Sequence, residues 1–151
     1  MVSTACPIAP ERVRNRLLAS LSPPERERLW PHLERVTLKP RQVLHHWGTP
    51  MTQVYFVEHG LVSVAARLDH TAAVEAWLIG REGMTGVPVV LGGDAAPPHR
   101  RVAQVGGSAW RIAADDLRRL MGESAALRAA LLRYAQVILL QTSQLEGFRA
   151  A

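Results

Sequence analysis

Histidines are the residues of this sequence that could most readily do chemistry. The chain holds six, and five of them lie in its strand-rich middle: His45, His46, His59, His70 and His99. Neutral imidazole is the commonest metal ligand in proteins. His45 and His46 are adjacent, however, so on a strand their side chains point to opposite faces and cannot both ligate one ion. We therefore expect histidines of the surface and of turns, and no metal site.

Motifs for other kinds of catalysis are missing from the sequence. It has no nucleophile motif, dinucleotide fingerprint or zinc-ligand spacing, and Gly83-Met84-Thr85-Gly86 is too short for a phosphate loop with its Lys and Ser. The single cysteine, Cys6, can form no internal disulfide and cannot hold an iron–sulfur cluster, which needs several thiolates. We expect a protein that is not an enzyme.

Length and composition indicate one folded domain. The 151 residues are the size of a single globular domain, and 48% hydrophobic against 21% charged residues leaves enough apolar material for a core. No apolar stretch reaches the roughly 20 residues that span a bilayer, and the N-terminus lacks the pattern of a secretion signal. Together with the lone cysteine, these features predict a cytoplasmic protein with no membrane partner.

The net charge of +5 raises the question of nucleic-acid binding. Regional charges are +4 over residues 1–41, −3 over 42–99 and +4 over 100–151. Basic residues stand among acids in the segments with helical periodicity, as in Glu25-Arg26-Glu27-Arg28, which is typical of a solvated helical face. Direct binding of nucleic acid would gather the charge into a stripe, so we expect none.

Hydrophobic periodicity predicts two short helices followed by many strands. The first helix covers residues 12–21, and Ser22-Pro23-Pro24-Glu25 has the spacing of a capping box that opens the second. Eight short strands separated by turn residues follow, at 36–38, 42–47, 53–58, 61–67, 73–79, 87–91, 101–105 and 108–112. Two of these runs flank Glu58-His59-Gly60 and predict a tight hairpin. The whole pattern predicts a mainly β fold, an antiparallel β-roll or jelly roll with flanking helices.

A long amphipathic helix closes the sequence. A short helix is expected over 113–122, and Ser124 can cap a longer one that runs to about residue 148. Apolar residues recur along it at steps of four and three with one polar interruption: Leu127, Leu131, Tyr134, Ile138, Gln141, Leu145 and Phe148. Such a seam predicts a dimer through paired helices; the alternative is that the stripe docks on the roll of its own chain. The domain would span 12–151, after a loose lead over 1–11.

The order of these elements resembles the sensor domain of bacterial transcription regulators of the Crp/Fnr family, over residues 12–146. The run Val54-Tyr55-Phe56-Val57-Glu58-His59-Gly60-Leu61-Val62-Ser63-Val64 matches the family's hairpin pattern, and Gln42-Val43-Leu44 and Gly48-Thr49-Pro50 precede it at the expected places. Gly80-Arg81-Glu82-Gly83-Met84-Thr85-Gly86 resembles the stretch that leads into the family's phosphate-binding cassette. The resemblance implies a cyclic-nucleotide-binding-like fold and a homodimer.

The resemblance also implies a site for a small effector, with cyclic AMP or cyclic GMP as the candidates. In the family, backbone N–H groups and an arginine bind the cyclic phosphate, and a glutamate binds the ribose. This assigns ligand binding to Gly83, Met84, Gly86, Val87 and Pro88, to Arg100 or Arg101, and to Thr142 and Ser143 of the last helix. Which arginine faces the pocket stays open. Val87 stands in the glutamate position and cannot accept a ribose hydrogen bond, so we expect a diverged or vestigial site.

Family regulators continue beyond the long helix into a winged helix-turn-helix that reads DNA. The sequence ends at Ala151, so we expect contact with DNA only through an output domain outside this chain. Two alternatives stay open. One is a small metal-binding enzyme similar to the cupins, which share the jelly roll and would use the histidines. The other is a protein-interaction module whose pocket binds no ligand.

Overall fold

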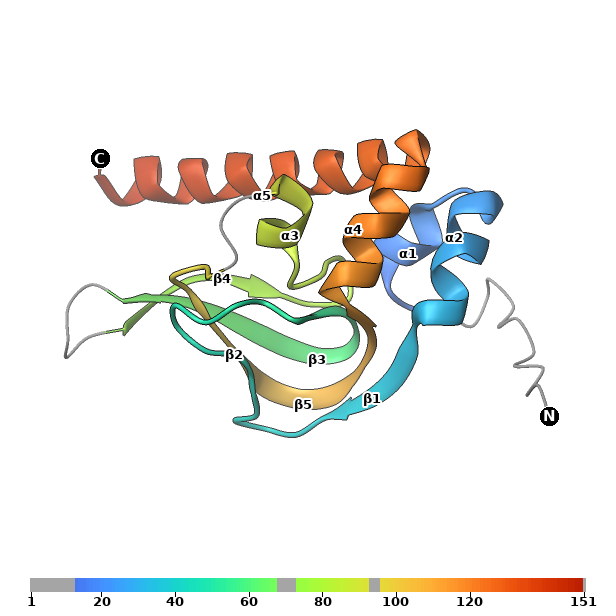
Figure 1. Cartoon of the computed structure of the whole chain (residues 1–151). Coiled ribbons are helices and arrows are strands. Elements are labelled where there is room, and N and C mark those ends of the chain that lie inside the picture. The colour runs from blue at the N-terminus through green and yellow to red at the C-terminus, as the bar shows by residue number, and fades with distance from the viewer. Residues whose placement is uncertain (1–12, 68–72, 93–95, 151) are drawn as a thin grey trace.

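The computed structural model describes residues 13–67, 73–92 and 96–150, with side chains described as far as Thr142. Its elements form a curved antiparallel roll with helices gathered along one side and at one end (Figure 1). The long last helix lies across the top of the roll in this view, and a short helix lies beneath it. No described helix is both long and apolar enough to cross a membrane. The predicted lead over 1–11 lies outside the described residues.

Five described strands build the roll. They are β1 (Glu34–Leu38), β2 (Val43–His45), β3 (Gln53–Arg67), β4 (Ala73–Ile79) and β5 (Arg100–Ala113). Hydrogen bonding joins them in the order β1-β5-β3-β4, and β2 also pairs with β5. All of these pairs are antiparallel. The predicted fold class, an antiparallel roll with flanking helices, is confirmed.

The predicted hairpin at Glu58-His59-Gly60 is wrong. Both of its runs belong to β3, a single bent strand of 15 residues, and both pair with β5. The predicted strands 101–105 and 108–112 merge in the same way within β5. Register shifts between β3 and β5 cluster around His59, so the two strands bend together without either one reversing.

Glycines at the bend explain why β3 continues in the same direction. Gly60 has a φ of +101°, and a Cβ on it would lie 2.5 Å from the carbonyl oxygen of Val105. A Cβ on Gly107, in the facing strand, would collide with the backbone of His59. These glycines let β3 and β5 approach at a separation that no side chain would allow. Gly60, which favours a turn when the sequence is read alone, therefore stands in the structure at a bend within a paired strand.

Residues 87–91 form a helix, α3 (Val87–Leu91), where the sequence predicts a strand. Valine favours strands, but helix signals bound the segment. Gly86 stands at the N-cap, Pro88 lies in the first turn, and Gly92 ends the helix in the left-handed conformation, with a φ of +69°. The three valines of α3 are buried in an apolar core. Flanking residues and packing thus outweigh the strand preference.

The remaining helices cover one end and one side of the roll. They are α1 (Arg16–Ser20), α2 (Pro23–Leu29), the 3-10 helix η2 (Trp30–His32), α4 (Ala114–Glu123) and α5 (Ala125–Ala150). Ser22 stands at the N-cap of α2, but its side chain makes no capping bond, so the predicted capping box does not form. The Ser124 hydroxyl does cap α5, because it accepts from the N–H of Leu127 at 3.2 Å.

Two apolar clusters and a polar network between them hold the elements together. The smaller cluster fills the roll with Leu38, Tyr55, Val57, Val62, Val64, Ile79, Ala103 and Ala109; the larger joins the helices to β3 and β5. Asn15, fully buried before α1, donates from its side chain to the carbonyls of Val57 and Gly83 at 2.7 and 2.8 Å. Its backbone N–H donates to Glu58 at 2.6 Å. The first helix is thereby tied to β3 and to the loop at Gly83.

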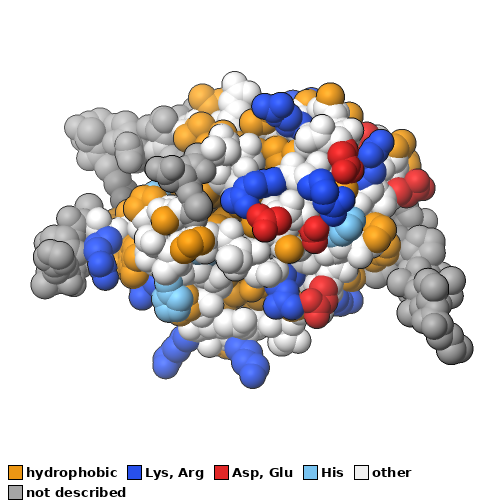
Figure 2. Space-filling model, in the orientation of Figure 1, with side chains coloured by type: hydrophobic (Ala, Val, Ile, Leu, Met, Phe, Trp, Pro, Cys, Tyr) orange, Lys and Arg blue, Asp and Glu red, His pale blue; other side chains and the backbone are white. Residues whose placement is uncertain are grey.

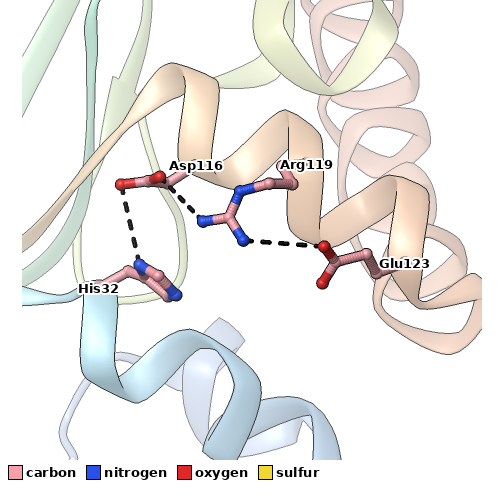
Figure 3. Close-up of polar contacts among 4 residues, drawn as sticks. All are labelled: His32, Asp116, Arg119 and Glu123. Atoms are coloured by element: carbon pink, nitrogen blue, oxygen red, sulfur yellow. Dashed lines mark hydrogen bonds and ion pairs between the residues drawn. The ribbon is translucent and has the colours of Figure 1, made fainter.

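Charged side chains on the helices pair locally. Figure 2 shows acidic and basic side chains interspersed over the helical part of the visible face. Asp116 lies 3.0 Å from Arg119 and 3.8 Å from His32, and Arg119 also lies 3.7 Å from Glu123 (Figure 3). Each exposed pair contributes little to stability. The arrangement agrees with the solvated helical faces expected from the sequence.

Gly60→Ala tests the bend of β3. The new methyl group would meet the carbonyl oxygen of Val105 and place alanine at a left-handed φ, so we expect the free energy of unfolding to fall by about 1–3 kcal/mol. Gly122→Ala is the control, because a Cβ there meets nothing within 4 Å and alanine favours the helix. Urea unfolding measures both variants. A Gly60→Ala protein as stable as the wild type would contradict the proposed role of the glycine.

Candidate ligand-binding site

The loop 83–86, called the cassette loop below, connects β4 to α3 and is fixed along β3. The N–H of Thr85 donates to the carbonyl of Tyr55, and the N–H of Tyr55 donates to the Thr85 hydroxyl, both at 3.0 Å. The N–H of Val57 donates to the carbonyl of Gly83 at 3.3 Å. The position of the loop is therefore set by the central strand of the roll.

Tyr134 of α5 places its hydroxyl against the cassette loop. The hydroxyl accepts from the N–H of Met84 at 3.1 Å and donates to the Met84 carbonyl at 3.3 Å. A Cβ on Gly83 would collide with this hydroxyl, so glycine is required there. The Met84 sulfur accepts from the N–H of Gly86 at 2.8 Å. Two backbone donors that could bind an anion are thus occupied by the protein's own side chains.

Arg101 is a charged residue that faces the interior of the roll. It lies on β5 opposite Val64 and is 1% exposed. No carboxylate among the described residues forms an ion pair with it, and its Nε has no hydrogen-bond partner. Successive side chains on a strand point to opposite faces, and Arg100 accordingly lies outside, over the ring of Trp47. Of the two candidate arginines, Arg101 is the interior one.

His45 of β2 is a hydrogen-bonding neighbour of that guanidinium. Its Nδ1 lies 3.4 Å from Nη1 of Arg101 and 3.1 Å from the carbonyl oxygen of His99, and its Nε2 lies 2.8 Å from the carbonyl oxygen of Thr49. With its proton on Nε2 the ring donates to Thr49 and can accept from Arg101 at Nδ1, but Nδ1 then makes no hydrogen bond with the His99 carbonyl, because both are acceptors. The imidazole can hold the arginine in place, but it brings no negative charge.

Burial sets the electrostatics of this interior. It lowers the pKa of Arg101 from 12.5 to about 10, and the interaction with Tyr134 opposes this shift in part. Burial also raises the pKa of Tyr134 from 10.0 to about 12, against the hydrogen bond with Met84. A desolvated positive charge thus lies near a neutral phenol, and none of the described carboxylates forms an ion pair with it.

The predicted ligand residues other than the two arginines fall into two groups. Gly83, Met84 and Gly86 belong to the cassette loop, and Val87 and Pro88 open α3 directly after it. Val87 is buried in the apolar core and Pro88 has no N–H to offer. Thr142 faces β4 instead: its hydroxyl donates to the carbonyl of Ile138, and it lines a cleft of about 240 Å³ against that strand. The side chain of Ser143 lies outside the described residues.

The predicted dimer seam faces the core of its own domain. Four of its members are buried in the larger apolar cluster, Leu127, Leu131, Tyr134 and Ile138. At these positions the alternative of docking on the roll describes the single chain, and the contact between two chains stays a prediction. The reason is that α3 and α4 pack against α5 and cover this face. Gln141 is exposed, and the side chains of Leu145 and Phe148 lie outside the described residues.

Sequence reasoning missed the parts that Tyr134 and His45 play here. Tyr134 fits an apolar stripe, and the one signal that distinguishes it is a hydroxyl that needs a partner when buried. His45 ends β2 and is 6% exposed, whereas Val43, two residues earlier, is exposed, so strand alternation alone could not have placed His45 inside. Among the described residues no three His, Cys, Asp or Glu side chains gather closely enough to hold a metal ion.

The chain belongs to the cyclic nucleotide-binding domain family, whose sequence profile matches residues 35–124. This range runs from β1 to the end of α4, so it includes the cassette loop, His45 and Arg101. No curated protein matches the chain.

Solved structures share the fold. The N-terminal domain of a transcriptional regulator from Streptomyces coelicolor A3(2) has a TM-score of 0.63 at 22% identity, covering 86% of this chain and 91% of that one. The sensor domain of the transcriptional regulator DNR from Pseudomonas aeruginosa has a TM-score of 0.66 at 17% identity, covering 85% and 86%. A mutant regulatory subunit of a cAMP-independent protein kinase A from Trypanosoma brucei, bound to cAMP in its A site, has a TM-score of 0.71 at 20% identity. The match covers 89% of this chain and 49% of the trypanosomal chain, so this chain spans about half of that subunit.

Tyr134→Phe tests the buried hydroxyl through its pH dependence. The pKa of Tyr134 is about 12 in the fold against an ordinary value of 10.0, so between these values unfolding releases a proton and the wild type loses stability as the pH rises. The lowered pKa of Arg101 acts in the opposite direction, and because Tyr134 opposes that lowering, its loss in Tyr134→Phe adds to the same trend in the difference between the two proteins. At about pH 8 we expect Tyr134→Phe to be less stable by about 1 kcal/mol, because the hydroxyl bonds are lost.

Toward about pH 11 this stability difference should shrink or reverse, because phenylalanine does not titrate. Chemical unfolding of both proteins at a series of pH values measures the trend. A difference that stays constant across the alkaline range would show that the hydroxyl is not held in its neutral form by the fold.

Proposed function

We propose that this chain is the sensor domain of a transcription regulator of the Crp/Fnr type, in which Arg101 binds an anionic effector. The observation that carries the proposal is a fully buried guanidinium with no carboxylate partner among the described residues. A charge removed from water is costly unless another group compensates it. Membership of the cyclic nucleotide-binding domain family and the fold shared with two bacterial regulators support this class.

A cyclic nucleotide is the effector that we propose. Its phosphate would pair with Arg101, and the N–H groups of Met84 and Gly86 would become its donors once their present partners move. Val87 offers no acceptor to a ribose hydroxyl. We therefore expect the phosphate to supply most of the affinity and the sugar to be poorly discriminated.

Effector binding would displace the hydroxyl of Tyr134. The phosphate and this hydroxyl compete for the same N–H of Met84. Because Tyr134 belongs to α5, its displacement would loosen the contact between α5 and the cassette loop and shift the packing of α5. The signal would then leave the domain along this helix.

We propose that two chains pair through the solvent face of α5. Ala125, Ala129, Leu132 and Gln136 recur there at steps of four, three and four, and all are exposed. Leu140 continues the face and is 57% exposed. This spacing is that of a helix–helix seam, and it lies opposite the stripe that packs into the domain core.

Contact with DNA would come from an output module attached outside this chain, such as a winged helix-turn-helix. The domain described above would supply the signal and the pairing of subunits. A bacterial regulator of this kind binds chromosomal DNA, which lies in the cytoplasm, so we propose a cytoplasmic location.

Isothermal titration with cyclic AMP and cyclic GMP tests the effector. We expect binding by the wild type and at least about tenfold weaker binding by Arg101→Met, because a hydrogen bond to a charged group contributes about 1.5–3 kcal/mol. Tyr134→Phe should bind a few fold more tightly, since its competing hydroxyl is gone. Arg118→Met is the control, because Arg118 lies exposed on α4 and pairs with Asp115 at 2.9 Å.

Each result of this titration has a distinct meaning. No heat with any protein at millimolar nucleotide would contradict a cyclic nucleotide effector and would favour a module whose pocket binds no ligand. Equal affinities of wild type and Arg101→Met would contradict the role of this arginine.

Leu132→Glu tests the proposed pairing of subunits. A carboxylate on the exposed face of α5 would place like charges opposite each other across the seam, so we expect the dimer to dissociate at least about tenfold more readily. Val105→Glu is the control, because Val105 is 52% exposed on β5, away from α5. Sedimentation equilibrium measures both variants. A wild type that stays monomeric at high micromolar concentration would contradict the pairing.

A further inference from the structure

Three strand ends meet around Trp47 on the outside of the roll. Trp47 follows β2, Arg67 ends β3 and Arg100 begins β5. The backbone there is fixed, because the N–H of Gly48 donates to the carbonyl of Pro97 at 3.0 Å and the pairing of β3 with β5 extends to Arg100. Side chains from distant parts of the sequence are therefore held together on a rigid frame.

Two guanidinium groups lie over the indole ring of Trp47. The guanidinium carbon of Arg67 lies 5.3 Å from the ring centroid, and that of Arg100 lies 5.0 Å from it. Both distances allow cation–π attraction, which gathers two like charges that would otherwise repel. Neither arginine forms an ion pair with a described carboxylate. The Nε of Arg100 is enclosed and has no hydrogen-bond partner.

A hollow of about 460 Å³ lies beside these groups, which is the size of a small-molecule site. It is lined by Trp47, Gly48, Ala66, Arg67, Pro98 and His99, and Arg100 is not part of this lining but borders it through the ring of Trp47. Burial and the charge of Arg101 lower the pKa of His99, so at neutral pH its ring adds hydrogen-bonding capacity without further positive charge. The ring is supported by Trp77, with centroids 5.5 Å apart. Among the described residues, the walls of the hollow carry aromatic and cationic side chains and no acidic one.

We propose that this hollow, the outer site, binds the phosphate groups of a phosphorylated small molecule. The planar fork of a guanidinium matches phosphate oxygens, and two forks on one ring suit a ligand with several anionic oxygens. The dimensions fit a small molecule, whereas a stable protein partner would need a much larger surface. The adjacent arginines then belong to two separate sites, Arg100 outside the roll and Arg101 inside it. The outer site does not depend on the proposed function of the interior.

Titration calorimetry with inorganic pyrophosphate tests the outer site. The full chain carries Arg101→Met in this experiment, so that the interior charge cannot contribute to binding. We expect binding in this background, and at least about tenfold weaker binding when Arg67→Met or Arg100→Met is added, because each guanidinium supplies charge-assisted hydrogen bonds. Trp47→Leu should weaken binding by a smaller factor, since it removes the platform and leaves both charges. Added Arg118→Met controls for net charge and should change nothing.

Equal affinities of the Arg67, Arg100 and Arg118 variants would overturn the outer site, and so would the absence of binding in a folded Arg101→Met protein. If circular dichroism shows that Arg101→Met does not fold, the three arginine variants are compared in the wild-type chain. There the outer site predicts that Arg67→Met and Arg100→Met weaken pyrophosphate binding and that Arg118→Met does not. Cyclic AMP binding that survives Arg100→Met separates the two sites.

Discussion

A full positive charge inside an apolar roll is the constraint from which the site follows. Arg101 shares the interior with valines and alanines of β3 and β5. The structure also buries a carboxylate, Glu58, but it is occupied by the N–H of Asn15 and by the indole of Trp110, at 2.6 and 2.5 Å. The buried anion therefore serves to fix the first helix, and none of the described carboxylates pairs with the buried cation. Strong desolvation of an unpaired charge is a common mark of a binding site.

Tyr134 orders the cassette loop but does not compensate the charge of Arg101. Its neutral phenol satisfies the Met84 N–H of the cassette loop but brings no charge, so the loop is ordered while the arginine stays uncompensated. The same residue anchors α5 to the roll, because its ring belongs to the larger apolar core. Ordering of the loop and docking of the helix therefore depend on one side chain. A change at the cassette loop would therefore act on α5, the longest of the described helices, through Tyr134.

The sequence predicts the types and order of most elements, the cap at Ser124 and the location of the cassette loop. Two errors and one undecided assignment have physical causes. Glycine at Gly60 is compatible with a turn or a bend, and only the close approach of Gly107 from β5 decides between them. The valines of 87–91 favour a strand until Gly86 and the packing of α3 are known. The apolar stripe of α5 is wide enough to cover a core and to meet a partner. Periodicity alone does not say which residues pack into the core and which could contact a second chain.

The bend between β3 and β5 has a consequence for the two arginines at the start of β5. These neighbours point to opposite faces in any register, but the observed register, with Arg101 opposite Val64 and Arg100 opposite Ala65, decides that Arg101 is the inner one. A slip by one residue would turn every side chain of the strand to the other face, exchanging the interior charge for the exterior one. Gly60 and Gly107 at the bend oppose this slip, because β3 and β5 can come so close only where these positions lack side chains. A contact between backbones far from the pocket thus determines which arginine lies inside the protein.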